Sequence, residues 1–95
     1  MKTSEVYVNM LTREEIAEKL KEILIYQNPG DSERIKKGTE ESGLIDYFGL
    51  SSVGMIYMII IIENEFGVSF DNVGMGDFKT LGDVVSYIEN AKKQG

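Results

Sequence analysis

An almost unbroken apolar segment, residues 53–66, constrains the fold of this chain more than any other feature. It reads Val-Gly-Met-Ile-Tyr-Met-Ile-Ile-Ile-Ile-Glu-Asn-Glu-Phe and is followed by Gly67. Runs rich in isoleucine suit buried strands as well as helices. Ordinary strands, however, span only about five to six residues, and this run is much longer. The segment is therefore predicted to be a helix from about Ser52 to Phe66, with Gly67 as its C-terminal stop.

Two further segments carry signals for helices. Thr12 and Glu15 form a capping-box pattern before apolar residues at helical spacing, and Pro29-Gly30 stops this first helix. Thr80 and Asp83 repeat the capping pattern before a last helix. The positions predicted to face the core of these two helices are Ile16, Leu20, Ile23, Leu24, Leu81, Val84, Val85 and Ile88.

Residues 28–51 form a long connection between the first helix and the apolar one, and loops of this length are usually functional. Its apolar side chains are expected to hold it against the core, namely Ile35, Leu44, Ile45, Tyr47, Phe48 and Leu50. A glycine-punctuated stretch, residues 73–78, is predicted to form a short helical turn. The sequence thus predicts a single all-α domain over residues 1–95, with a core spanning about 12–90. Its architecture is a small four-helix bundle, three main helices plus one short helix, with a long first loop.

The chain contains no cysteine and no histidine. A disulfide framework and a thiolate metal site are therefore excluded, and the usual general base of enzymes is missing. We predict no catalytic residue, no intrinsic metal site and no enzymatic activity.

The net charge of −6 is concentrated in the second half of the chain. Residues 39–91 contain one base, Lys79, against the acids Glu40, Glu41, Asp46, Glu63, Glu65, Asp71, Asp77, Asp83 and Glu89. Such a half repels nucleic acid and anionic lipid and favours basic partner surfaces, although acids also serve solubility. The first ten residues lack a signal-peptide pattern, and the run Met55–Ile62 is shorter than the roughly 20 residues of a membrane span. A monomeric cytoplasmic protein is expected.

Three motifs, in this order along the chain, resemble the acyl carrier protein family. Gly49-Leu50-Ser51-Ser52-Val53 resembles the Gly-Leu-Asp-Ser-Leu-type loop that opens a helix in that family, and Glu65-Phe66-Gly67 resembles the end of the same helix. Residues 78–85, Phe-Lys-Thr-Leu-Gly-Asp-Val-Val, are similar to the segment that leads into the family's last helix. The resemblance covers about residues 12–90.

The resemblance implies that Ser52 carries a 4′-phosphopantetheine arm. A phosphopantetheinyl transferase would attach it from coenzyme A with magnesium, and the arm's thiol would carry acyl groups as thioesters. Fatty-acid, polyketide or related specialised biosynthesis is the implied setting, and the implied partners are that transferase and acyl-loading or acyl-processing enzymes with basic or apolar docking surfaces. Ser51 stands where the family has aspartate, which leaves the fit to a standard transferase open. Ser51 is also an alternative attachment point, although the spacing to Phe66 favours Ser52.

The residues around Ser52 support attachment but no catalysis. A serine beside a helix start is exposed, and the helix dipole favours an attached anion by about 0.3–1 kcal/mol. No base lies next to it in the sequence, so it is not expected to be a hydrolase nucleophile. The alternative interpretation is that Ser51 or Ser52 serves only as a helix N-cap.

The apolar helix also carries a second stripe of side chains. Its core-facing positions are predicted to be Met55, Ile59, Ile62 and Phe66. The other stripe is predicted to dock partners, together with Glu63 on the same helix, and consists of Val53, Ile56, Tyr57 and Ile60. The alternative is that the long first loop covers it. Two further functions stay open, an aminoacyl or peptidyl carrier and an unmodified carrier-like scaffold.

Overall fold

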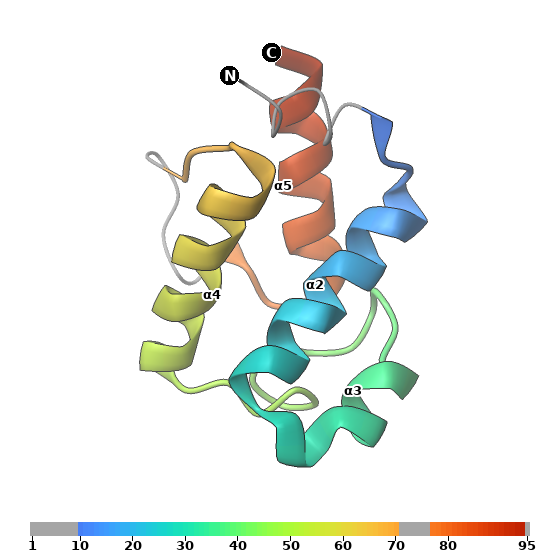
Figure 1. Cartoon of the computed structure of the whole chain (residues 1–95), viewed down its shortest axis with the longest axis vertical. Coiled ribbons are helices and arrows are strands. Elements are labelled where there is room, and N and C mark those ends of the chain that lie inside the picture. Colours follow the sequence, from blue (N-terminus) through green and yellow to red (C-terminus); the bar gives the residue numbers. More distant parts are fainter. Residues whose placement is uncertain (1–9, 71–76, 95) are drawn as a thin grey trace.

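The computed structural model describes residues 10–70 and 77–94, with side chains described as far as residue 91. Its helices are α2 (Arg13–Gln27), the 3-10 helix η1 (Pro29–Asp31), α3 (Ser32–Lys37), α4 (Ser52–Phe66) and α5 (Leu81–Gln94). Within these described ranges no strand is formed, so the all-α prediction is confirmed. Figure 1 shows α2, α4 and α5 as the three long helices, with α3 at the end of the bundle where α2 finishes.

Helix α2 begins and ends as its sequence predicts. The Glu15 amide donates to Thr12 Oγ1 over 3.1 Å, and the Thr12 amide donates back to Glu15 Oε1 over 2.9 Å. At the other end Asn28 is the C-cap, and Pro29 follows, which cannot continue the hydrogen-bonding pattern. The capping box thus satisfies amides that the first turn would otherwise leave unpaired.

The connection between α2 and α4 contains the short helices η1 and α3, which the sequence did not predict. With only six residues and one buried apolar side chain, Ile35, α3 is too short to show a helical period. The rest of the connection packs mainly through Leu44 and Phe48, which are 0% and 2% exposed. The prediction for Ile45 was wrong, since its side chain is 63% exposed. Residues 43–49 form helix-like turns, which place Leu44 and Phe48 on one side and Ile45 on another.

The connection is also tied to the start of α5. The Leu44 amide donates to the Lys79 carbonyl over 2.9 Å, and Gly43 and Thr80 form an isolated antiparallel bridge. Asp83 Oδ2 accepts hydrogen bonds from the Lys79 and Thr80 amides, which lower the pKa of its carboxyl. The capping role predicted for Thr80 is confirmed, because its Oγ1 accepts from the Asp83 amide over 3.2 Å.

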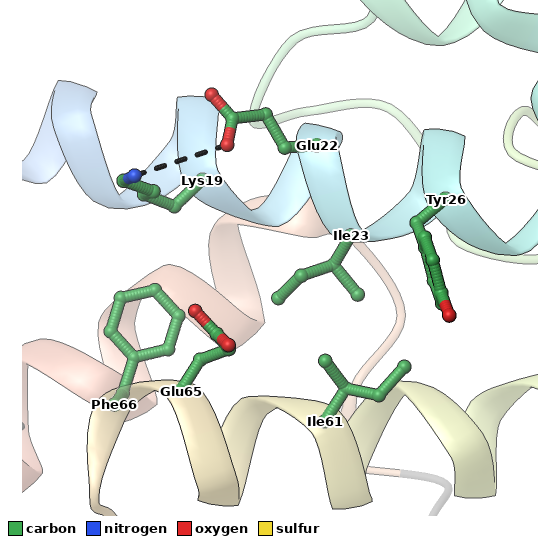
Figure 2. Close-up of a pocket in the computed structure, with 7 residues that line it drawn as sticks. All are labelled: Lys19, Glu22, Ile23, Tyr26, Ile61, Glu65 and Phe66. Carbon is green, nitrogen blue, oxygen red and sulfur yellow. Dashed lines mark ion pairs between the residues drawn. The ribbon is translucent and has the colours of Figure 1, made fainter.

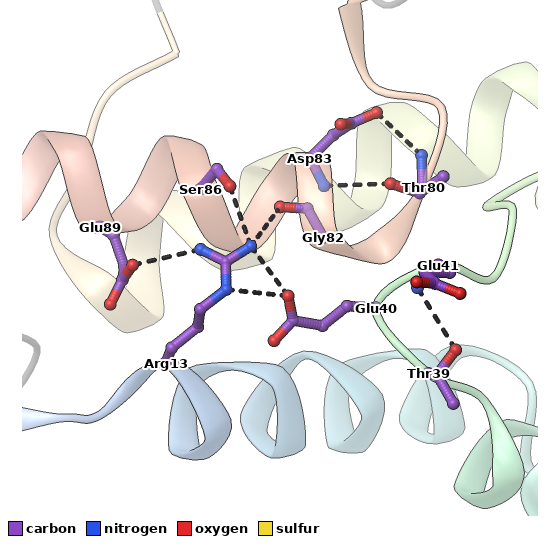
Figure 3. Close-up of polar contacts among 9 residues, drawn as sticks. All are labelled: Arg13, Thr39, Glu40, Glu41, Thr80, Gly82, Asp83, Ser86 and Glu89. Atoms are coloured by element: carbon purple, nitrogen blue, oxygen red, sulfur yellow. Dashed lines mark hydrogen bonds and ion pairs between the residues drawn. The ribbon is translucent and has the colours of Figure 1, made fainter.

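Arg13 joins three segments at the beginning of α2 (Figure 3). Its guanidinium donates to Glu40 Oε1 of the connection over 2.8 Å and to Glu89 Oε1 of α5 over 3.2 Å. It also donates to Ser86 Oγ over 3.0 Å. The hydrogen bond to Glu40 is the main reason that the pKa of Arg13 is raised. This network fixes the position of the start of α2 relative to α5 and to the connection.

One apolar core lies between the long helices and the connection. It contains all eight positions predicted for α2 and α5. On α4 the buried residues are Met55, Met58, Ile62 and Phe66, so Met58 takes the place predicted for Ile59, which is only partly buried. The helical turn predicted near residues 73–78 falls largely on residues 71–76, outside the described part of the chain.

Gly82 lies in the first turn of α5, where helix propensity alone would favour alanine. The neighbouring connection is nevertheless expected to leave no room for a side chain there. An added Cβ would lie 2.9 Å from the Glu40 carbonyl oxygen. Alanine is about 1 kcal/mol better than glycine in helices, but contact with a backbone atom outweighs that gain. Gly82→Ala is therefore expected to lower the free energy of unfolding by about 1–3 kcal/mol, measured by urea denaturation.

Gly30→Ala is the matched control. An added Cβ there meets no atom within 4 Å, so the free energy of unfolding should stay unchanged or rise by about 0.4–1 kcal/mol. A Gly82→Ala protein as stable as the original would show that α5 can move away from Glu40 at no cost.

Candidate functional site

The two adjacent serines at the start of α4 have different roles. Ser51 is the N-cap, and its Oγ accepts a hydrogen bond from the Gly54 amide over 3.1 Å. Ser52 is the first helical residue, its side chain is exposed, and within the described chain its hydroxyl has no protein hydrogen-bond partner. The capping role that the sequence left open between them therefore belongs to Ser51. Ser52 keeps a hydroxyl that faces solvent.

A sharp turn leads the chain into these serines. Gly49 has a φ of 74°, a left-handed conformation that costs other residues about 1–2 kcal/mol. The Leu50 amide donates to the Leu44 carbonyl over 3.0 Å and holds the turn against the buried part of the connection. Gly49 therefore lets the backbone bend into the loop that carries the two serines.

Arg34 borders the same turn from α3. Its Nη2 would lie 3.3 Å from a Cβ at Gly49, and it pairs with Asp31 Oδ2 over 3.0 Å. The guanidinium also lies 5.9 Å from the ring centroid of Tyr47, whose hydroxyl donates to the Arg34 carbonyl. A cation is therefore held beside the loop that precedes Ser52. Sequence reasoning missed it, because the approach of Arg34 to Gly49 depends on how the connection folds.

Gln27, at the end of α2, fixes the first turn of α4. Its Nε2 donates to the Gly54 carbonyl over 3.2 Å, whereas its buried Oε1 has no hydrogen-bond partner in the described part of the chain. A Cβ at Gly54 would lie 3.3 Å from Leu50 Cδ2, so the absence of a side chain lets the loop pack closely on the helix. The position of Ser52 is thereby determined by α2 as well as by its own loop.

The electrostatics of this end of α4 suit an anion. The helix has no acidic residue in its first turn, and the sequence has no charged residue from Tyr47 to Ile62. Amide groups at a helix start lack intrahelical partners, and the dipole there is positive. The arrangement can hold a negatively charged group on Ser52, but no residue next to Ser52 in the sequence is a base that would activate the hydroxyl.

The second apolar stripe of α4 is exposed. Its side chains keep about half of their surface accessible, at 59% for Val53, 50% for Ile56, 58% for Tyr57 and 47% for Ile60. The alternative that the long connection covers this stripe is therefore wrong. Glu63 differs from the four, because it is partly buried and its Oε2 accepts a hydrogen bond from the Phe70 amide over 2.9 Å. The carboxylate of Glu63 therefore holds the segment after α4 against the end of this helix.

Comparison with known proteins identifies the family, although no family model matches the chain. The chain is 40% identical over 86 residues to a protein of Thermotoga maritima named acyl carrier protein, covering 90% of this chain and all of that protein. The chain belongs to the acyl carrier protein family. It is also 32% identical over 78 residues to the acyl carrier protein of Sinorhizobium fredii and to acyl carrier protein AcpP of Rhizobium meliloti. Each of these two matches covers 82% of the chain and 96% of the relative.

Membership of the acyl carrier protein family confirms the resemblance inferred from the loop at residues 49–53 and the end of α4. It supports a carrier role and agrees with the small helical bundle seen in Figure 1. Among the described helices, none is both long enough and apolar enough to cross a membrane.

Proposed function

We propose that this chain is a stand-alone acyl carrier protein that receives a 4′-phosphopantetheine arm on Ser52. The observation that carries the proposal is the division of roles at the start of α4. Ser51 provides the helix cap, so the Ser52 hydroxyl is exposed beside it and has no hydrogen-bond partner among the described residues. When attached, the arm would supply a thiol for the acyl group, which this cysteine-free chain lacks.

The residues near Ser52 fit the phosphodiester of such an arm. The first turn of α4 contains no carboxylate to repel it, and the helix dipole favours a negative charge by about 0.3–1 kcal/mol. In the modification, Ser52 Oγ would lose its proton and bond to the phosphorus of coenzyme A that bears the pantetheine, while the diphosphate P–O bond breaks and adenosine 3′,5′-bisphosphate leaves. No charged residue lies between Tyr47 and Ile62, so the base for that proton would come from a separate transferase.

A specialised biosynthetic pathway is part of the proposal. Its support is the exposed stripe of α4, which is apolar, whereas carriers of fatty-acid synthesis often have acidic residues there. The names of the relatives favour acyl cargo over aminoacyl or peptidyl cargo. We also propose that the protein acts as a cytoplasmic monomer with no catalytic activity of its own and no intrinsic metal.

The test is the intact mass of the purified protein after incubation with coenzyme A, magnesium and a broad-specificity phosphopantetheinyl transferase. An increase equal to one phosphopantetheine is expected, and peptide mapping should assign it to Ser52. A folded protein that gains no mass with several such transferases would instead be an unmodified carrier-like scaffold.

A further inference from the structure

A positive charge lies beside the loop that leads to Ser52, although the second half of the chain is acidic. The sequence contains no lysine or arginine in residues 38–78. The charge comes instead from Arg34 on α3, whose Nη2 would lie 3.3 Å from a Cβ at Gly49. Ser52 follows Gly49 by three residues, so the Cα atoms of the two residues lie at most about 11 Å apart. A cation is therefore close to the proposed attachment point.

The guanidinium of Arg34 is held in place by its neighbours. Its Nη2 donates to Asp31 Oδ2 over 3.0 Å, and the Asn28 side chain donates to the same oxygen over 2.9 Å. The guanidinium carbon also lies 5.9 Å from the centroid of the Tyr47 ring, within the range of a cation–π contact. A planar group that is already oriented loses little conformational freedom when it binds an anion.

Helix α3, which carries Arg34, is itself fixed to α2. Lys21 Nζ of α2 donates to the carbonyls of Lys36 and Gly38 over 3.1 Å and 3.2 Å, and the Lys21 side chain is only 13% exposed. A lysine at this place satisfies carbonyls that the end of a helix leaves unpaired. The Tyr47 hydroxyl also donates to the Arg34 carbonyl over 2.7 Å. The fold therefore sets the position of Arg34 beside the loop.

Arg34 keeps hydrogen-bonding capacity for an anion. A guanidinium has five N–H donors, and among the described residues the only side chain that accepts from it is Asp31. The Arg34 side chain is 48% exposed, so solvent reaches its remaining donors. Two N–H groups on one edge of a guanidinium match two oxygens of a phosphate group. A phosphodiester has two such oxygens and one negative charge, so it is a suitable ligand for Arg34.

A second cation, in the pocket between α2 and α4, does not suit an anion on Ser52 (Figure 2). The pocket has a volume of about 280 Å³ and is lined by two acids, Glu22 and Glu65, but by one base, Lys19. Figure 2 shows the ion pair of this base, whose Nζ lies 3.9 Å from Glu22 Oε1. Glu65 is the last residue but one of α4, about 20 Å along the helix axis from Ser52. The pocket therefore lies towards the opposite end of α4.

We propose that Arg34 binds the phosphodiester once Ser52 has been modified. Its guanidinium would donate hydrogen bonds to the phosphodiester oxygens and hold the beginning of the arm beside α3. The start of α4 would act on the same charge, because its amides lack intrahelical partners and its dipole is positive there. Because this anion exists only on a modified Ser52, the assignment rests on the proposed function. Arg34 is a binding residue in this account and takes no part in the attachment reaction.

The test compares the melting temperature of each protein before and after modification by the broad-specificity transferase. Modification is expected to raise the melting temperature of the original protein by about 2–6 °C more than that of Arg34→Gln, as one partly exposed ion pair would. The difference should disappear at about 0.5 M NaCl, because salt screens an exposed pair. The phosphorus NMR signal of the phosphodiester should likewise respond to salt in the original protein but not in Arg34→Gln. Comparing each variant with its own unmodified form removes any effect of the substitution on the unmodified fold.

Lys37→Gln is the matched control, because Lys37 is an exposed cation on the same helix and its loss changes the net charge equally. It should keep the full gain in melting temperature. Equal gains in the original protein and Arg34→Gln would overturn the inference while Ser52 is still modified, as would an equal loss of the gain in Lys37→Gln. If Arg34→Gln slowed modification but kept the gain, Arg34 would act on the incoming coenzyme A instead. Absence of modification in the original protein would overturn the proposed function itself, and the role of Arg34 with it.

Discussion

Replacing Ser52 by alanine is expected to abolish the addition of phosphopantetheine completely, whereas Ser51→Ala should still accept one arm. The Ser52 hydroxyl is the proposed point of attachment and makes no hydrogen bond to the described protein. Its loss should therefore change the free energy of unfolding by less than about 0.5 kcal/mol. Ser51→Ala removes the cap on the Gly54 amide and should cost about 1 kcal/mol. Intact mass and urea denaturation of the two proteins measure both effects.

The two serine variants control for each other, because they separate attachment from capping. If Ser52→Ala gained the arm and Ser51→Ala did not, the attachment point would be Ser51. A third variant, Ser51→Asp, keeps a good capping residue and restores the carboxylate that the family usually has at this position. A faster rate of modification in Ser51→Asp would show that Ser51 limits the reaction with a standard transferase.

Phe48→Ala is expected to lower the free energy of unfolding by about 3–5 kcal/mol. Phe48 belongs to the connection between α2 and α4, yet only 2% of its surface is exposed. Its ring packs so closely on Gly38 that a Cβ there would lie 2.5 Å from Phe48 Cζ, and it meets the Tyr47 ring edge-on at 5.1 Å. Because domains of this size are stable by only about 5–15 kcal/mol, the variant should be partly unfolded at 37 °C. Thermal and urea denaturation measure the loss.

Ile45→Ala is the matched control in the same turn. Ile45 is 63% exposed, so its replacement should change the free energy of unfolding by no more than about 0.5 kcal/mol. If Phe48→Ala were equally harmless, the connection would be a surface loop that does not help to form the core.

The long helices could be predicted from the sequence because their signals are local. The capping box at Thr12 and the stop at Gly67 act within a few residues of their own positions, and both are confirmed. Helix α3 could not be predicted in the same way, since a single buried residue, Ile35, sets no period. The prediction that Ile45 packs against the core was wrong for a related reason. The apolar character of a residue does not show which side of a turn faces the core.

The site was predictable as far as its motif extends along the chain. The loop at residues 49–53 indicated the two serines, and the structure assigned the cap to Ser51. The contacts of Gln27 with Gly54 and of Arg34 with the turn at Gly49 had no signal in the sequence, because they join residues far apart in the chain. Whether the stripe of α4 is covered also depended on where the connection packs, which no periodicity reveals.

The helix cap at Ser51 has a consequence for the order in which this chain folds and is modified. Because Ser51, not Ser52, satisfies the Gly54 amide, esterifying the Ser52 oxygen breaks no hydrogen bond of the described fold. If Ser52 is modified as proposed, the newly synthesised chain can therefore reach its final structure before a transferase acts on it. The unmodified and modified forms should therefore have the same backbone at α4. Apart from the pairing with Arg34, the arm should shift the folding equilibrium only by about 0.3–1 kcal/mol, which is what the helix dipole gives an anion.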